Sequence, residues 1–276
     1  MFSVELRYLF LCIFLTACQT MTAQTAIPTP SRVIVVIEEN HSYSEIFGSA
    51  QAPYINTLAS EGAVFTHSYA VTHPSEPNYL ALFSGSTHGV TGDNCPLTYS
   101  SGSLESQLHA ASRTFEGYSE ELPSVGSMVC IYNEYARKHV PWTDFSADKP
   151  TDNVPFSYFP SSDFEHLPTV SFVIPDLLDD MHDGSIQQGD AWLQQHLLSY
   201  VTWARDNNSL LILTFDEDDS TESNHILTLF VGPMVKPGEY TQTINHYNVL
   251  RTIEQMYKLP YLGKAATATP ITNIWK

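Results

Sequence analysis

The run Val33-Ile34-Val35-Val36-Ile37 leads directly into Glu38-Glu39-Asn40-His41-Ser42. A continuous stretch of β-branched apolar residues is typical of a strand that is buried on both faces of a parallel sheet. The polar residues that follow stand where such a strand ends, and in open α/β sheets this end carries the chemistry. The two features together predict an α/β fold with functional groups at one edge of the sheet.

The rest of the chain repeats this alternation. Apolar runs recur at residues 169–174, 209–215 and 226–231, and helical patterns occupy residues 53–61, 104–112, 190–205 and 247–257. Strands that alternate with helices predict a three-layer α/β sandwich around a mostly parallel sheet. Residues 141–168, rich in Pro, Asp, Ser and aromatic residues, are expected to form a long surface excursion, with a lid as one interpretation.

An export signal is predicted at the N-terminus. Arg7 precedes a short apolar run from Tyr8 to Phe14, which has the size of a signal-peptide core and is too short to span a membrane. It is followed by Leu15-Thr16-Ala17-Cys18, which resembles the lipobox of bacterial lipoproteins, in which the cysteine is lipidated. An ordinary secretory peptide cleaved nearby is the alternative. Either reading predicts an exported protein, held in the periplasm or at the outer membrane by an N-terminal lipid anchor, or secreted.

Length and charge limit the remaining possibilities. The chain has 276 residues, which we divide into a leader (1–18), a polar tether (19–31) and one folded domain (32–276). Lys and Arg number 12 against 30 Asp and Glu, a formal net charge of −18. Such a surface repels phosphate backbones, so no nucleic-acid partner is expected. A hydrophobic content of 43% excludes intrinsic disorder for most of the length.

Four cysteines are present, and two of them, Cys12 and Cys18, lie in the leader. Cys95 and Cys130 are therefore the pair left in the mature protein, and an oxidising compartment would allow a disulfide between them. Two unpaired buried thiols are the alternative.

Acidic residues follow three of the predicted strands. The first strand leads into Glu38 and Glu39, the strand at 209–215 into Asp216-Glu217-Asp218-Asp219, and the strand at 169–174 into the acidic stretch 176–183. A single acidic cluster is commonly a solvated turn, but carboxylates gathered from several strand ends require a cation or protons. Oxygen ligands with histidine suit zinc, manganese, magnesium or calcium, which the sequence does not separate.

A further candidate is Ser75, within His73-Pro74-Ser75-Glu76-Pro77-Asn78, directly before a short apolar helix. A serine at this position can act as a nucleophile whose alkoxide is stabilised by backbone N–H groups and a metal. The alternative is that Ser75 is a plain helix N-cap.

Several motifs in this order resemble the bacterial acid phosphatase and phospholipase C phosphoesterase family, a branch of the alkaline phosphatase superfamily. They are Glu39-Asn40-His41-Ser42, His73 to Tyr79, Asp176 with His182-Asp183, Thr214-Phe215-Asp216-Glu217, and Asn245-His246-Tyr247 with residues 250–254. The resemblance runs from about Arg32 to Trp275. It implies an alkaline-phosphatase-like fold and hydrolysis of phosphate esters.

The resemblance also implies roles for individual residues. Glu39, Asn40, Ser75, Asp216 and Glu217 would bind a divalent metal, with Ser75 also the nucleophile and Glu217 standing where some members have a second aspartate. His182 is our candidate for the acid that protonates the leaving group. The expected substrate-binding side chains are those of His73, Asn78 and His246, and His41 is a candidate for orienting Asn40.

The function predicted is an exported, metal-dependent phosphomonoesterase of the acid phosphatase type that acts through a phosphoserine intermediate. Phosphoinositides are one substrate class that the family allows. A phospholipase C acting on phosphodiesters is the alternative among enzymes, and the short chain favours the phosphatase. A non-catalytic surface lipoprotein that binds a metal or an anion is the alternative of another class.

Overall fold

The computed structural model describes residues 1–2 and 26–276. The predicted leader and the lipidation of Cys18 fall almost entirely on the remaining residues, so they lie outside the described part of the chain. In the described residues, no helix is both long and apolar enough to cross a membrane.

One large sheet organises the domain, and its strands run in the order β11-β2-β10-β9-β1-β8-β4-β7. The strands are β1 (Arg32–Glu38), β2 (Ala63–Phe65), β4 (Phe115–Ser119), β7 (Asn153–Pro155), β8 (Val170–Ile174), β9 (Ser209–Phe215), β10 (Thr228–Val231) and β11 (Gly238–Tyr240). Only β10 runs antiparallel to its neighbours in this sheet, β9 and β2. The predicted α/β fold with a mostly parallel sheet is confirmed.

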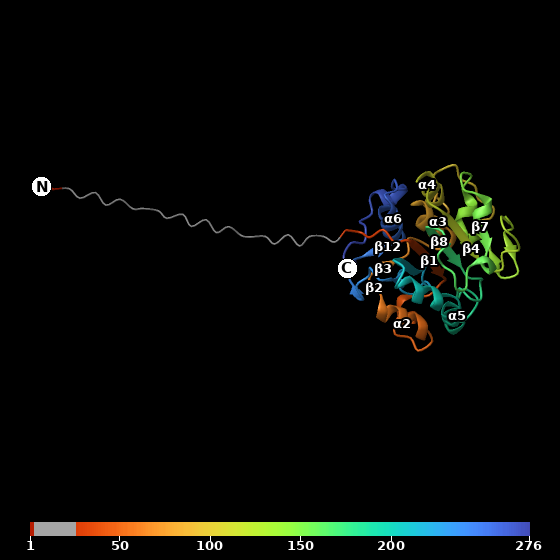
Figure 1. Cartoon of the computed structure of the whole chain (residues 1–276), viewed down its shortest axis with the longest axis horizontal. Helices are drawn as coiled ribbons and strands as arrows, with labels where there is room; N and C mark the ends of the chain where they lie inside the picture. Colours follow the sequence, from red (N-terminus) through yellow and green to blue (C-terminus); the bar gives the residue numbers. More distant parts are fainter. Residues whose placement is uncertain (3–25) are drawn as a thin grey trace.

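Helices cover both faces of the sheet, as Figure 1 shows. On one face α2 (Pro53–Glu61) and α5 (Ile186–Ala204) pack against Ile34 and Val36 of β1. On the other face α3 (Glu76–Ser84), α4 (Leu104–Ala110) and α6 (His246–Tyr257) pack against Val33, Val35 and Ile37. Because both faces of β1 are buried, its sequence is continuously apolar instead of alternating.

Shorter elements complete the described chain. They are the helix α1 (Tyr43–Ile46), the paired strands β3 (Ser68–Tyr69) and β12 (Ile244–Asn245), the hairpin of β5 (Ile131–Tyr132) and β6 (Tyr135–Ala136), and the 3-10 helices η1 (Arg137–His139), η2 (Pro141–Asp144), η3 (Pro150–Asp152), η4 (Phe156–Tyr158) and η5 (Gly263–Ala266). Cys95 and Cys130 form a disulfide beside the hairpin, which confirms the predicted pairing.

The segment 141–168 differs from the expected surface excursion. It supplies the edge strand β7, and Trp142 and Phe164 are buried in the cores on opposite faces of the sheet. The Trp142 indole lies directly over Gly117 of β4, where a Cβ would stand 2.0 Å from the ring. The interpretation as a lid is wrong because these aromatic side chains anchor the segment to the sheet.

Candidate active site

Two adjacent parallel strands bring the first acidic side chains together. In the pairing of β1 with β9, Glu38 stands opposite Phe215, so Glu39 and Asp216 follow at the same edge of the sheet. The Asn40 N–H donates to Asp216 Oδ1 at 3.1 Å, and the Asp216 N–H donates to the Glu38 carbonyl at 2.9 Å. Asn40 has a left-handed φ of 55°, a conformation that asparagine tolerates better than most residues and that turns the chain at this point.

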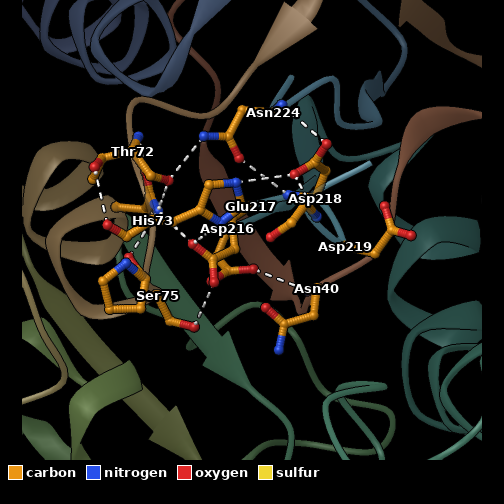
Figure 2. A network of polar contacts seen from close by, with 12 residues as sticks. Asn40, Thr72, His73, Ser75, Asp216, Glu217, Asp218, Asp219 and Asn224 are labelled. Atoms are coloured by element: carbon orange, nitrogen blue, oxygen red, sulfur yellow. Dashed lines mark hydrogen bonds and ion pairs between the residues drawn. The ribbon is translucent and has the colours of Figure 1, made fainter. Parts of the chain in front are cut away.

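Ser75 faces this pair of carboxylates from the start of α3. Its hydroxyl, only 2% exposed, donates to Glu39 Oε2 at 3.0 Å and lies 3.5 Å from Glu217 Oε1. Ser75 has helical backbone angles and makes no side-chain cap hydrogen bond to α3. Ser75 is the N-cap residue of α3 by position, but its side chain does not cap the helix, and the hydroxyl is directed to the acidic groups (Figure 2).

The acidic side chains are buried next to one another. Burial raises the pKa of Asp216 to about 7, and burial together with the charge of Asp216 raises the pKa of Glu217 to about 8. Burial and the charges of Asp216 and Asp180 raise the pKa of Glu39 as well. Asp216 Oδ2 is buried without a hydrogen-bond partner. Buried, mutually repelling carboxylates with an unpartnered oxygen fit a divalent cation, which supplies the missing positive charge.

His73 holds Glu217 in place. Its Nδ1 lies 2.9 Å from Glu217 Oε2 and its Nε2 lies 3.0 Å from Asp218 Oδ1. Asp218 is fixed in turn by backbone N–H groups of Ser220, Glu222 and Asn224. Figure 2 shows His73, Glu217 and Asp218 facing one another, whereas Asp219 points away from them. The Asp219 carboxylate accepts a hydrogen bond from the Ser42 hydroxyl. His73 remains partly exposed, with 37% of its side chain accessible, so it borders the site.

Two of the expected substrate-binding residues instead position their neighbours. Asn78, 1% exposed, accepts hydrogen bonds from the Val71 and Thr72 N–H groups and donates to Glu217 Oε2 at 3.4 Å. His246, also 1% exposed, has its Nε2 2.7 Å from the Asp216 carbonyl. Since both side chains are buried and used internally, the structure does not favour direct contact with a substrate.

His182 lies at the border of the site. Its Nδ1 is 2.8 Å from Asp183 Oδ1, and its Nε2 is 3.3 Å from Lys138 Nζ. Lys138 also donates to Asp93 at 2.9 Å, and Asp93 accepts the Glu76 N–H next to Ser75. Lys138 and His182 line a hollow of about 450 Å³. The predicted acid is therefore beside the acidic cluster and accessible.

Glu39 has further partners that the sequence did not indicate. Its second oxygen, Oε1, accepts a hydrogen bond from the Tyr79 hydroxyl and lies 3.3 Å from His139 Nε2. His139 Nδ1 lies 3.4 Å from Asp180 Oδ2, and Glu39, His139 and Asp180 form a buried group that could hold a metal ion. Asp180 belongs to the acidic stretch after β8, but His139 and Lys138 follow the short hairpin, where no strand-end pattern marks them.

His41, which was considered from the sequence, and Arg251 of α6 do not reach the cluster. His41 Nδ1 lies 2.9 Å from Glu45 Oε2, within the first turn of α1, so the expectation that it orients Asn40 is wrong. Arg251 donates to the carbonyls of Ala265 and Ala266 and covers the ring of Tyr261. Lys138 is therefore the basic side chain that the fold brings near the acidic groups.

Known proteins are similar to this chain in sequence and in fold. The profile of the Phosphoesterase family matches residues 47–260. A phosphatidylinositol-3-phosphatase of Mycobacterium tuberculosis is 54% identical over 259 residues, 93% of this chain and 87% of that protein. An acid phosphatase of Aspergillus fumigatus is 31% identical over 261 residues, 85% of this chain but 56% of that protein, so the chain spans about half of the fungal relative. A solved structure from Vibrio parahaemolyticus, a protein in the alkaline phosphatase superfamily, has a TM-score of 0.59 at 11% identity and covers 88% of this chain and 71% of its own.

The predicted alkaline-phosphatase-like fold is confirmed by the last of these similarities. The sequence matches argue against the alternative of a non-catalytic binding protein, because the relatives are named as phosphatases. The profile takes in Ser75, Asp216 and Glu217, the residues that meet at the strand edge. The chain therefore belongs to the Phosphoesterase family and is a hydrolase of phosphate esters.

Proposed function

We propose that this phosphoesterase is a metal-dependent phosphomonoesterase that works through a phosphoserine at Ser75 and acts on phosphoinositides. The observation that carries the proposal is the buried Ser75 hydroxyl, 3.0 Å from Glu39 Oε2 and free of any capping role in α3. A hydroxyl held beside acidic groups at a helix start is oriented for attack on an electrophile.

The reaction has two displacements at phosphorus. Ser75 Oγ attacks the phosphate ester, the bond to the substrate oxygen breaks, and the alcohol leaves with a proton. Water then attacks the phosphoserine, which releases inorganic phosphate and returns the hydroxyl of Ser75. Glu39 Oε2 orients the attacking oxygen through its hydrogen bond. His73 fixes the carboxylate of Glu217, the other acidic group near the Ser75 hydroxyl.

A divalent metal fits the acidic cluster. Glu39, Asn40, Ser75, Asp216 and Glu217 would hold it, and when bound it would lower the cost of ionising the serine and neutralise phosphate charge. The buried, unpartnered Asp216 Oδ2 supports this assignment.

His182 is the proposed acid that gives the leaving alcohol its proton. Its Nδ1 lies 2.8 Å from Asp183 Oδ1, which fixes the orientation of the ring. Lys138, 3.3 Å from Nε2, adds positive charge at the entrance and attracts a phosphate dianion.

The surface beside this entrance supports a lipid substrate. One stretch next to the disulfide exposes several apolar side chains, with accessible fractions from 39% to 74%: Val125, Met128, Val129, Ile131 and Tyr132. Ile131 also lines the hollow that contains Lys138 and His182. Exposed apolar side chains beside a hollow lined by Lys138 and His182 suit a phosphorylated headgroup attached to a bilayer. The similar mycobacterial protein is named a phosphatidylinositol-3-phosphatase, which supports the same substrate class.

Vesicle hydrolysis tests the lipid proposal. Ile131→Ser combined with Tyr132→Ser should reduce hydrolysis of phosphatidylinositol 3-phosphate in phosphatidylcholine vesicles by about tenfold or more, because each exposed apolar side chain contributes about 1 kcal/mol or more of binding. Turnover of p-nitrophenyl phosphate should be unchanged. Leu198→Ser, on a leucine of α5 that is 47% exposed, close to the 46% of Tyr132, is the control and should alter neither rate. Equal losses in both variants would contradict the assignment of this surface.

A substrate panel tests the monoesterase proposal. We expect p-nitrophenyl phosphate to exceed bis-p-nitrophenyl phosphate and phosphatidylcholine by about a hundredfold in kcat/KM, a difference of under about 3 kcal/mol in transition-state binding. Exhaustive chelation should abolish turnover and a divalent ion should restore it. A preference for either diester would favour the phospholipase C alternative, and full activity without metal would refute metal dependence.

Export as a lipoprotein is part of the proposal. The Cys95–Cys130 disulfide supports an oxidising compartment. Wild-type protein should partition with membranes into detergent, and Cys18→Ser should release it. Recovery of the wild type in the cytoplasm with reactive thiols would contradict export.

A further inference from the structure

A second group of potential metal ligands lies outside the proposed catalytic cluster. Glu105 and His109 are one turn apart on α4, and Asp152 ends η3 immediately before the edge strand β7. One ligand atom from each of the three side chains falls within 4.8 Å of the others. None of the three takes part in the proposed reaction.

The distances within this group suit a small cation. His109 Nε2 lies 2.7 Å from Asp152 Oδ2 and 3.4 Å from Glu105 Oε1. Zinc binds nitrogen and oxygen ligands at about 2.0 to 2.1 Å in tetrahedral geometry, which separates ligand atoms by about 3.3 Å. The three side chains therefore need only small shifts to share one ion.

One buried oxygen atom in the group lacks a partner. Glu105 is fully buried, and its Oε2 has no hydrogen bond although its Oε1 accepts the Lys149 N–H. Buried carboxylate oxygens are costly without a hydrogen bond or a cation. A proton on Glu105 would leave a buried donor without an acceptor, whereas a metal ion would satisfy the oxygen.

The imidazole is held in a suitable orientation. His109 Nδ1 lies 3.4 Å from Lys149 Nζ, so the opposite nitrogen, Nε2, faces the carboxylates. The ring is partly accessible, with 21% of the side chain exposed, which gives an ion a path into the site.

We propose that Glu105, His109 and Asp152 bind a divalent transition-metal ion of the zinc class. The ion ties α4 to the segment that forms the outermost strand of the sheet. Because the site joins two elements and contains no nucleophile, its role is structural. The inference does not depend on the proposed function, since it concerns a different group of side chains.

Metal content tests the proposal. Wild-type protein loaded with zinc and dialysed should retain about one equivalent more than His109→Gln, measured by elemental analysis. Added zinc should raise the Tm of chelated wild-type protein, and this shift should be absent in His109→Gln. His166→Gln is the matched control, because His166 is 87% exposed and lies outside the group. Turnover of p-nitrophenyl phosphate by metal-replete His109→Gln should stay near that of wild type at a temperature where both are folded.

Two further variants keep the test decisive. Asp152→Asn, at a partly exposed side chain, should lose the same equivalent if His109→Gln fails to fold. Asp216→Asn should keep this equivalent while losing activity, so failure of the catalytic proposal and failure of this one are distinguishable. Zinc content and zinc-induced stabilisation that are the same in His109→Gln, Asp152→Asn and His166→Gln would overturn the proposal.

Discussion

Replacement of Ser75 by alanine separates the stability of the fold from the chemistry of the site. The side chain is 2% exposed, and its removal deletes a hydrogen bond to Glu39 at 3.0 Å and a weaker contact to Glu217 at 3.5 Å. A hydrogen bond to a charged group contributes about 1.5 to 3 kcal/mol, and the loss of one hydroxyl leaves little empty volume. The backbone of α3 is unaffected because the hydroxyl does not cap it. We therefore expect a loss of free energy of unfolding of at most about 3 kcal/mol.

The effect on turnover should be far larger. Deletion of a nucleophile that also serves as a ligand removes the covalent route, and losses of about 10⁴-fold or more in kcat are usual for such residues. The assay is p-nitrophenyl phosphate hydrolysis with metal added, measured beside urea unfolding. Ser84→Ala is a matched control at the far end of α3, since that hydroxyl bonds only to groups outside the acidic cluster. A folded Ser75→Ala variant with more than about a tenth of wild-type activity would refute the assignment of the nucleophile.

Two further predictions concern stability. Burial raises the pKa of Glu254 to about 8. Between about pH 4.3 and pH 8 the unfolded chain therefore releases a proton that the folded chain keeps. The free energy of unfolding should fall over this range by at most about 5 kcal/mol as the pH is raised. Glu254→Gln should remove this part of the slope while its amide oxygen still accepts the Leu262 N–H, and urea unfolding at pH 5 and pH 8 checks this; equal slopes in both proteins would contradict it. Gly117→Ala should cost about 3 kcal/mol because the new Cβ would stand 2.0 Å from the Trp142 ring, and an unchanged midpoint of unfolding would show that this packing is not tight.

The elements that could be predicted from the sequence are those whose signal is local. The strand at 209–215 and the helix at 53–61 have the predicted bounds, because each carries an uninterrupted period and a clear boundary. The antiparallel direction of β10 could not be predicted, because a short apolar run has the same pattern in a parallel and in an antiparallel strand. The segment 141–168 was misread because its polar and proline residues conceal the buried Trp142 and Phe164.

The candidate site divides in the same way. Glu39 and Asp216 could be predicted to meet because the parallel pairing of β1 with β9 places their positions side by side. The approach of His139 to Glu39 depends on how the hairpin of β5 and β6 folds back, and no local pattern encodes that path. The contact of His246 could not be predicted either, because its partner is the backbone carbonyl of Asp216. Every residue type has a backbone carbonyl, so the sequence does not mark this one.

The charge balance of the site explains why few basic residues are needed. A protein with a net charge of −18 has to bind a phosphate dianion, and Lys138, the cation that lies nearest the acidic groups among the described residues, is already paired with Asp93. The carboxylates of Glu39, Asp216 and Glu217 would repel such a substrate if they stood alone. A divalent ion held by these carboxylates would reverse the local sign of charge, and it would both attract the substrate and remove their mutual repulsion. The same acidic groups that make the metal-free site repel phosphate therefore make the proposed activity depend strictly on metal, and this dependence sets a phosphoesterase of this composition apart from one built on arginine.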